Sequence, residues 1–189
     1  METELRLERA KREDKRAVKD LYLRAFPPEE RPPFGMLWRR AARGKGELLA
    51  AWDGTEFVGL VSLLGRGDVV YLFYLAIDEN RRGAGYGSAI LALVRQRCEG
   101  KRLFLARETL DPAAENYDQR LRRHRFYLRN GFSDLPLRLR EGQVVYDVMG
   151  TGGLVSGEEY RALMDDWAGW LGRFVKMELW STEEGGGER

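Results

Sequence analysis

The sequence VVYLFYLAIDENRRGAGYGSAIL, residues 69–91, decides the fold that we expect for this chain. Its first nine residues, Val69–Ile77, are apolar or aromatic and carry no charge. Such a run is typical of a strand buried on both faces, where the usual alternation with polar residues is lost. A glycine-rich turn follows, and apolar residues from Ile90 to Cys98 then recur on one face of a helix. The stretch therefore predicts a strand, a glycine turn and a helix in that order.

This order of elements can bind an anion. The first backbone N–H groups of a helix have no acceptor within the helix and lie at the positive end of its dipole. Glycines let the backbone approach a phosphate closely, because they lack a Cβ atom and accept positive φ. Arg81 and Arg82 add positive charge beside the turn. We predict a cradle for a diphosphate, and the alternative is a surface turn in which the glycines only end the strand. The cradle would consist of Gly83, Ala84, Gly85, Tyr86, Gly87 and Ser88.

The spacing of the glycines excludes two common phosphate loops. A Walker A loop closes with Lys followed by Ser or Thr, and no such pair follows this turn. A Rossmann fingerprint has two residues between its last two glycines, whereas Gly85 and Gly87 have one between them. A nucleotide held in either of those ways is therefore not expected.

At this turn the sequence resembles the GNAT superfamily of acetyl-CoA-dependent N-acetyltransferases. The signature of that family is Arg or Gln, two residues, Gly, one residue, and Gly or Ala, which Arg82, Gly85 and Gly87 fit. The resemblance implies an α/β GNAT fold, with a mixed, mostly antiparallel sheet flanked by helices, and acetyl-CoA as co-substrate. In such proteins the strand before the turn pairs its backbone with the pantetheine arm of CoA. The residues in the matching positions are Leu75, Ala76 and Ile77.

A second motif supports the same resemblance. The segment FYLRNGF, residues 126–132, looks like the family's helix-end pattern of Tyr, three residues, Gly-Phe. In this family the tyrosine at that position often lies near the sulfur of CoA. A phenol with an ordinary pKa of about 10 can protonate the thiolate that leaves when an amine attacks a thioester. We therefore predict Tyr127 as the general acid, and the alternative is a core aromatic residue.

The sequence offers three candidates for the general base. Some members of the family carry a glutamate early in the central strand, where this chain has Tyr71. A carboxylate or an ordered water is needed, because an amine with a pKa of about 10.4 is neutral in only about one molecule in a thousand at pH 7. The substitutes are Glu108, just after the predicted strand 101–106, and Glu29 and Glu30 in the connector PPEERPP. Each of them is also compatible with an ordinary solvated glutamate.

The predicted helix of residues 116–129 differs from the family in one position. Members often have an asparagine seven residues before the tyrosine, where this chain has Arg120, while Asn116 lies four residues earlier. We expect Asn116 either to contact the pantetheine or pyrophosphate of CoA or to cap the helix. Arg122 and Arg123 are candidates for contacting the 3′-phosphate, and the alternative is a solvated helix face.

The composition is that of an ordinary soluble globular protein. The 189 residues are 43% hydrophobic and 33% charged, and the formal net charge is +2. Such a balance does not indicate a general nucleic-acid-binding surface. The single cysteine cannot form an internal disulfide, and the sequence shows no apolar signal segment or membrane span, so we expect a cytoplasmic protein. No metal-ligand cluster is visible, and we expect no metal.

We expect one domain with a short appendage. The GNAT domain is predicted for residues 1–150, a C-terminal helix that packs on this domain or on a dimer partner for residues 151–180, and a loose tail for residues 181–189. The glycines of residues 150–153 suggest a hinge before the appendage. The other predicted helices are 9–26 and 34–43, and the other predicted strands are 5–7, 47–52, 57–64, 132–139 and 143–149.

The predicted function is transfer of an acetyl group from acetyl-CoA to a primary amine by direct attack in a ternary complex. The sequence does not identify the acceptor, which can be a small molecule or a peptide. One alternative is a non-catalytic acyl-CoA-binding or regulatory domain, and another is an acetyltransferase linked to RNA or tRNA through its arginine-rich helix.

Overall fold

The computed structural model describes residues 5–28, 31–169 and 177–182. Within these residues the chain forms eight strands and five α-helices, and the strands make one mixed, mostly antiparallel sheet. The chain divides into two compact units, one of residues 1–65 and 72–99 and the other of residues 66–71 and 100–189. The predicted α/β class is confirmed.

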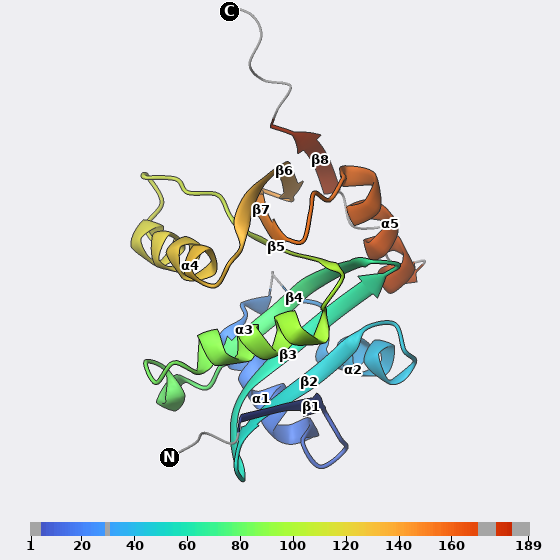
Figure 1. The fold of residues 1–189 in the computed structure, drawn as a ribbon, viewed down its shortest axis with the longest axis vertical. Coiled ribbons are helices and arrows are strands. Elements are labelled where there is room, and N and C mark those ends of the chain that lie inside the picture. Colours follow the sequence, from blue (N-terminus) through green and yellow to red (C-terminus); the bar gives the residue numbers. More distant parts are fainter. Residues whose placement is uncertain (1–4, 29–30, 170–176, 183–189) are drawn as a thin grey trace, which may run out of the picture. The chain divides into compact units, whose positions relative to one another are not determined.

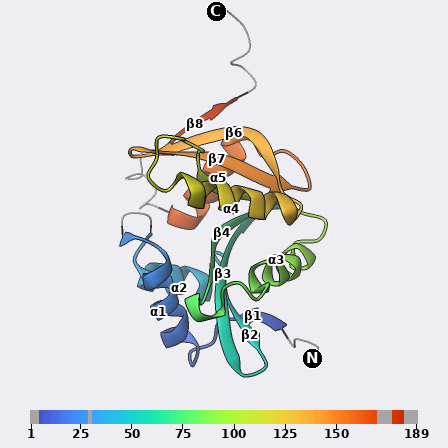
Figure 2. The same cartoon turned by 90° about the vertical axis from the view of Figure 1, so that its left-hand side faces the viewer.

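The first unit, coloured blue to green in Figure 1, contains three of the helices. Its strands are β1 (Leu5–Arg9), β2 (Glu47–Asp53), β3 (Glu56–Arg66) and the greater part of β4 (Val69–Ile77). Its helices are α1 (Lys15–Ala25), α2 (Phe34–Ala42) and α3 (Tyr86–Arg97). Strand β2 pairs antiparallel with β1 and with β3. Helices α1 and α2 lie on one face of these strands and α3 lies on the other (Figure 2).

An aromatic cluster fills the face under α1 and α2. The ring of Tyr22 lies 5.7 Å from the rings of Phe26 and Phe34 and 5.2 Å from that of Tyr74, measured between centroids. Tyr74 reaches this cluster from β4, where it is buried. The cluster therefore fixes α1 and α2 against the central strand.

Close backbone approach fixes the other face of β4 under α3. A Cβ atom at Gly59 of β3 would lie 2.6 Å from the carbonyl oxygen of Ala76 and 3.2 Å from Cδ1 of Ile77. Glycine is needed here because any side chain would push β3 and β4 apart. Ile90 and Leu91 of α3 are buried, as the helical periodicity predicts.

The second unit contains the other two helices. Its strands are β5 (Arg102–Glu108), β6 (Ser133–Glu141), β7 (Val144–Thr151) and β8 (Met177–Ser181), and its helices are α4 (Tyr117–Arg129) and α5 (Gly157–Ala168). The first three residues of β4 pair parallel with β5, and β5-β7-β6-β8 continue antiparallel in that order. The whole strand order is β1-β2-β3-β4-β5-β7-β6-β8. The parallel pairing across α3 confirms the predicted strand-helix-strand unit.

Stacked aromatic rings join β4, β5 and α5. Tyr71 stacks on Phe104 with centroids 4.7 Å apart and planes only 3° apart, and Tyr160 of α5 lies 5.4 and 5.5 Å from these two rings. Arg102 adds an ionic link, because its guanidinium binds Asp68 at 2.7 Å and Glu159 at 2.6 Å. Helix α5 is thereby packed against β4 and β5 within the second unit.

Two predicted boundaries are wrong, namely the start of the first helix and the start of the hinge at residues 150–153. The helix predicted from residue 9 begins at Lys15, because β1 continues to Arg9 and the carboxylate of Asp14 accepts a hydrogen bond from the N–H of Lys11 in the turn that follows. The predicted hinge begins inside β7, where Gly150 pairs with residues of both β5 and β6. A Cβ atom at Gly150 would lie 3.1 Å from the carbonyl oxygen of Leu103, so tight packing explains this glycine.

The C-terminal part also differs from the prediction. Helix α5 ends at Ala168, and strand β8, which the sequence did not predict, pairs antiparallel with β6. Residues Ser181 and Thr182 of the predicted tail belong to this edge, since the N–H of Thr182 donates to the carbonyl of Pro136. The predicted helical positions Leu171 and Phe174, and residues 183–189, lie outside the described residues.

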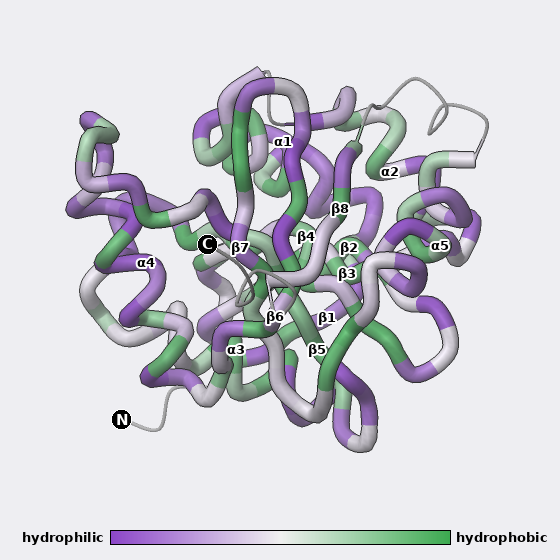
Figure 3. Tube along the Cα trace, turned by 90° about the horizontal axis from the view of Figure 1, so that it is seen from above, coloured by the Kyte–Doolittle hydropathy of each residue, from purple (hydrophilic) through white to green (hydrophobic). Residues whose placement is uncertain are grey.

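Helix α4 has no fully buried residue. Its apolar spacing predicts an inner face of Tyr117, Leu121 and Leu128, of which Tyr117 and Leu121 are half-buried whereas Leu128 is 43% exposed. The half-buried positions are Tyr117, Arg120, Leu121, His124, Phe126 and Tyr127. Hydrophilic colours prevail along this helix in Figure 3, so polar contacts replace the apolar stripe that the pattern suggested.

Candidate functional site

The glycine turn of the first unit leaves β4 at Asp78. The N–H of Asp78 donates to the carbonyl of Val58, and its carboxylate accepts from the N–H of Asn80, which starts a short 3-10 turn at Glu79–Arg81. Gly83 and Gly85 then have φ values of 83° and 84°. A Cβ atom at either position would meet nothing within 4 Å. Glycine is therefore required here by the left-handed backbone rather than by crowding.

The backbone N–H groups at the start of α3 are open to a ligand. The first backbone hydrogen bond of the helix runs from Ala89 N to Gly85 O, at 3.1 Å. The N–H groups of Tyr86, Gly87 and Ser88 therefore precede the intrahelical ladder. The first turn of α3 carries no acidic residue, and residues 82–85 are exposed. The turn has the open amides and the charge that a phosphate group requires.

The two arginines before the glycines have different environments. The guanidinium of Arg81 lies 2.6 Å from the carboxylate of Glu56, so its charge is compensated. Arg82 is exposed and makes no ion pair or side-chain hydrogen bond with any residue that the structure describes. Arg82, which is also the arginine of the signature, is thus the one of the two that is available to an anion.

Two further contacts hold this turn within the first unit. The phenol of Tyr86, the first residue of α3, donates a 2.6 Å hydrogen bond to Oδ2 of Asp53. This bond raises the pKa of Tyr86 above its ordinary value. Arg24 of α1 binds the carboxylate of Asp78 at 3.2 Å. The turn is therefore fixed at its start, its middle and its end.

The strand residues predicted to face the pantetheine arm lie at the carboxyl end of β4. The ladder that joins β4 to β5 runs from Val69 to Tyr71, and its last pair is Tyr71 with Phe104. Leu75 and Ile77 are half-buried and alternate with the buried Tyr74 and Ala76. The first unit thus brings these strand residues and the glycine turn together, since Ile77 directly precedes the turn.

The second unit contains Tyr127. Its ring lies 5.2 Å from Phe126 and 5.7 Å from Phe132, and its carbonyl accepts from the N–H of Phe132. Its hydroxyl makes no hydrogen bond to any other described residue. Burial raises the pKa of the phenol above its ordinary value of 10, and the charge of Arg123 opposes this shift. The hydroxyl therefore carries its proton at neutral pH and has a donor free for a ligand.

Glu108 and Asn116 are both engaged by Arg120. The guanidinium of Arg120 lies 2.7 Å from Oε1 of Glu108, and Arg123 lies 4.0 Å from Oε2. Arg120 also donates to the side-chain oxygen of Asn116 at 2.7 Å and to the carbonyl of Thr109 at 2.9 Å. Asn116 precedes α4 without capping it through its side chain. These bonds tie the start of α4 to the end of β5.

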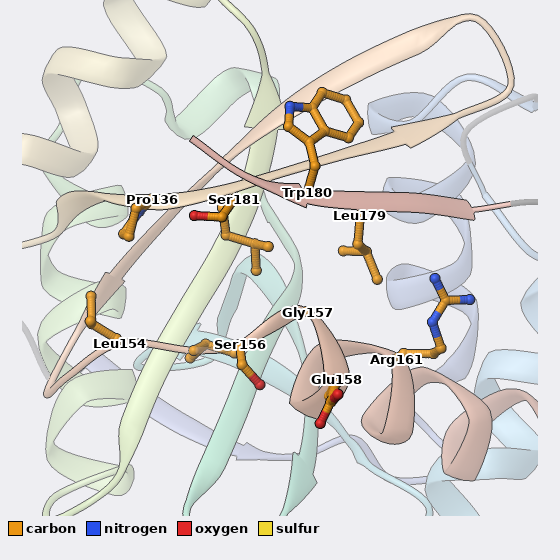
Figure 4. Close-up of a pocket in the computed structure, with 11 residues that line it drawn as sticks. Pro136, Leu154, Ser156, Gly157, Glu158, Arg161, Leu179, Trp180 and Ser181 are labelled. Atoms are coloured by element: carbon orange, nitrogen blue, oxygen red, sulfur yellow. The ribbon is translucent and has the colours of Figure 1, made fainter. Parts of the chain in front are cut away.

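Glu29 and Glu30 lie outside the described residues. None of the predicted cofactor-binding or catalytic residues that the structure describes lines the groove shown in Figure 4. That groove, of about 670 Å³, lies between the start of α5, β6 and β8, and Leu154, Arg161 and Trp180 are among its lining residues.

Among the described residues, no three side chains of His, Cys, Asp or Glu gather in a way that could hold a metal ion.

Glu141 is a carboxylate that the sequence reasoning missed. It ends β6, is half-buried, and its carboxylate makes no hydrogen bond or ion pair with another described residue. Burial raises the pKa of this carboxyl above its ordinary value. The pKa of Tyr71 is raised well above its ordinary value, mainly by burial, then by Tyr160, and then by the charge of Glu141. The carboxylate therefore influences the ionisation of Tyr71 in the aromatic cluster. Glu141 directly precedes Gly142, as residues of a turn between strands often do, and no sequence signal marks it as functional.

Comparison with known proteins shows the family and the fold of the chain. The sequence model of the acetyltransferase (GNAT) family matches residues 15–132, more than half of the chain. No curated protein matches the sequence significantly. Among solved structures, a GNAT-family acetyltransferase from Bacteroides thetaiotaomicron has a TM-score of 0.68 at 21% identity, over 88% of this chain and 97% of its own.

Two other structural neighbours have known acceptors or ligands in their descriptions. The ribosomal-protein-S18-alanine N-acetyltransferase from Escherichia coli has a TM-score of 0.61 at 18% identity, over 82% of this chain and 97% of its own. An aminoglycoside 6′-N-acetyltransferase complexed with coenzyme A has a TM-score of 0.59 at 14% identity, over 77% and 96% of the two chains. At these identities the likeness establishes a shared fold.

The fold and the glycine turn define an acyltransferase. The chain belongs to the acetyltransferase (GNAT) family, as the match to residues 15–132 shows. The predicted family and fold are therefore confirmed. No helix among the described residues is both long and apolar enough to cross a membrane.

Proposed function

We propose that this enzyme transfers an acetyl group from acetyl-CoA to a primary amine by direct attack in a ternary complex. The observation that carries the proposal is the turn from Arg82 to Ser88, with its unpaired guanidinium and its open amides at the start of α3. Two structural neighbours are described as complexes with CoA, which supports an acyl-CoA co-substrate.

The turn fits the pyrophosphate of CoA. The N–H groups of Tyr86, Gly87 and Ser88 and the guanidinium of Arg82 would hold it, because none of these donors has an acceptor among the described residues. Gly83 and Gly85 would let the backbone approach it. The end of β4, from Leu75 to Ile77, would align the pantetheine arm.

Tyr127 is proposed as the general acid. When the amine attacks the thioester carbonyl, a C–N bond forms, the C–S bond breaks and the sulfur leaves with the electron pair. The phenol of Tyr127 can donate its proton to that sulfur, because its hydroxyl has no partner among the described residues and burial keeps it protonated.

Glu141 is the carboxylate that we propose for the proton of the attacking amine, directly or through water. A base needs a free lone pair, and no described residue forms a hydrogen bond or ion pair with the half-buried carboxylate of Glu141, whose pKa burial raises. Glu108 was predicted for this role, but Arg120 occupies one of its oxygens at 2.7 Å. We propose that Glu108 and Asn116 instead position α4 through Arg120.

The acceptor is proposed to be a primary amine of a small molecule or a peptide. The structural neighbours include enzymes described for spermidine and for a ribosomal-protein alanine, and both acceptors are amines. The lone, buried cysteine supports a reducing, cytoplasmic location.

A thiol-release assay tests the function. Acetyl-CoA is incubated with the enzyme and a panel of polyamines, aminoglycosides, amino acids and peptide N-termini, and CoA release is followed. Release with at least one amine class, reduced in the Tyr127→Phe variant, supports the proposal. Calorimetric binding of CoA without release for any amine would instead favour a non-catalytic binding domain.

A further inference from the structure

The hydrogen bond between Tyr86 and Asp53 lies at a place where it can control the glycine turn. Tyr86 is the first residue of α3, directly after the left-handed Gly85. Asp53 ends β2 and pairs with Glu56 of β3 across the hairpin Asp53-Gly54. The 2.6 Å bond therefore connects the N-terminus of α3 to a rigid hairpin 33 positions earlier in the sequence.

The same hairpin holds the turn at a second point. Glu56, which faces Asp53 across the hairpin, binds the guanidinium of Arg81 at 2.6 Å. This ion pair is exposed, with side chains of 39% and 54% relative exposure, so solvent weakens it. The bond to the Tyr86 phenol also has a charged acceptor, but it is partly buried, so solvent weakens it less.

Between the points where these contacts hold it, the glycine backbone of the turn offers little resistance to movement. Its two glycines at positive φ have open space around them, and residues 82–85 are exposed. A glycine-rich segment of this kind loses much conformational entropy when it adopts one geometry. A link that holds its end in place removes part of this cost before a ligand binds.

We infer that Asp53 is a positioning residue for acyl-CoA binding, which acts through the Tyr86 phenol to hold the amides of the glycine turn in their binding geometry. The inference rests on the proposed function, because the ligand of the turn is the pyrophosphate of CoA. Asp53 touches neither the ligand nor the reacting atoms. Its loss is therefore expected to weaken CoA binding and to leave the chemical step unchanged.

The test compares Tyr86→Phe, Asp53→Ala and the double variant with the wild type, because alanine leaves no acceptor for the Tyr86 hydroxyl. Calorimetry with CoA gives the dissociation constant, and thiol release gives kcat and KM. Each single variant is expected to raise the dissociation constant and the KM for acetyl-CoA about tenfold at unchanged kcat, the effect of losing one hydrogen bond to a charged group. The double variant should be no worse than either single one, because both remove the same bond.

The matched control is Glu47→Gln. Glu47 lies on the same strand as Asp53 and binds Arg97 at 2.6 Å, at the other end of α3. Glu47 also binds Arg9 at 2.9 Å, so its loss should lower the melting temperature too, and it should leave CoA binding unchanged. Equal CoA affinity in wild type and Tyr86→Phe, or equal weakening by Glu47→Gln, would overturn the inference. A wild-type enzyme that fails to bind CoA would overturn the proposed function, and the inference with it.

Discussion

The two adjacent arginines before the glycine turn should respond very differently to substitution. Arg82 has no partner among the described residues, whereas Arg81 already binds Glu56 at 2.6 Å. A guanidinium that donates to a phosphate contributes about 1.5–3 kcal/mol, which corresponds to about a tenfold to hundredfold change in affinity. Arg82→Ala should therefore raise the dissociation constant of CoA by about that factor. Arg81→Ala removes only an exposed ion pair, worth about 0.2–1 kcal/mol, so its effect should stay below about fivefold.

Calorimetric titration with CoA at two salt concentrations checks both parts of this prediction. Wild-type affinity should fall with added salt, and the dependence should be weaker in Arg82→Ala, because one charge contact to phosphate is missing. Arg81→Ala should keep the salt dependence of the wild type. Loss of affinity in Arg81→Ala that equals or exceeds the loss in Arg82→Ala would refute the assignment of the two arginines.

Three further predictions concern the proton transfers and the sheet. Tyr127→Phe should lower kcat by about a hundredfold, the usual range for one acid-base group, with little change in CoA affinity; equal turnover would reject its role as acid. Glu141→Gln should lower kcat at high pH, and the acidic limb of the profile of kcat against pH should disappear. In the wild type the inflection of that limb should lie above the ordinary pKa of a carboxyl group, because burial raises the pKa of Glu141. The pKa of Glu141 is higher in the folded protein than in the unfolded chain. The free energy of unfolding of the wild type should therefore also fall as the pH rises from the unfolded-state pKa to the folded-state pKa of this carboxyl. Denaturant titration of Glu141→Gln should show no such fall. Gly59→Ala should destabilise the protein by about 1–3 kcal/mol in denaturant unfolding, since the new Cβ would lie 2.6 Å from the carbonyl oxygen of Ala76; an unchanged midpoint would contradict the tight β3–β4 packing.

The parts of the fold that sequence reasoning recovered are those fixed by local signals. The run Val69–Ile77 forms β4 with the predicted bounds, and the glycines after it end in α3. The hairpin at Asp53-Gly54 is also where its turn chemistry places it. Each of these elements depends on residues within a few positions of one another, so the pattern carries the information.

The parts that were missed depend on partners far away in the sequence. Strand β8 exists because Met177–Ser181 pairs with β6, about 40 positions earlier, and its own five residues carry only a weak strand pattern. The difference between Arg81 and Arg82 is set by Glu56, which lies 25 positions before Arg81 in the sequence. The isolation of the Glu141 carboxylate likewise follows from packing, and no local pattern announces it.

The burial of the single cysteine has a practical consequence. Cys98 closes the apolar face of α3 at 6% exposure, so thiol-reactive dyes should label the native protein slowly. A cysteine introduced in place of the exposed Ala84 would then be the one fast-reacting position. A fluorophore attached there would sit beside the helix amides and report ligand occupancy by its emission, without any coupled enzyme assay.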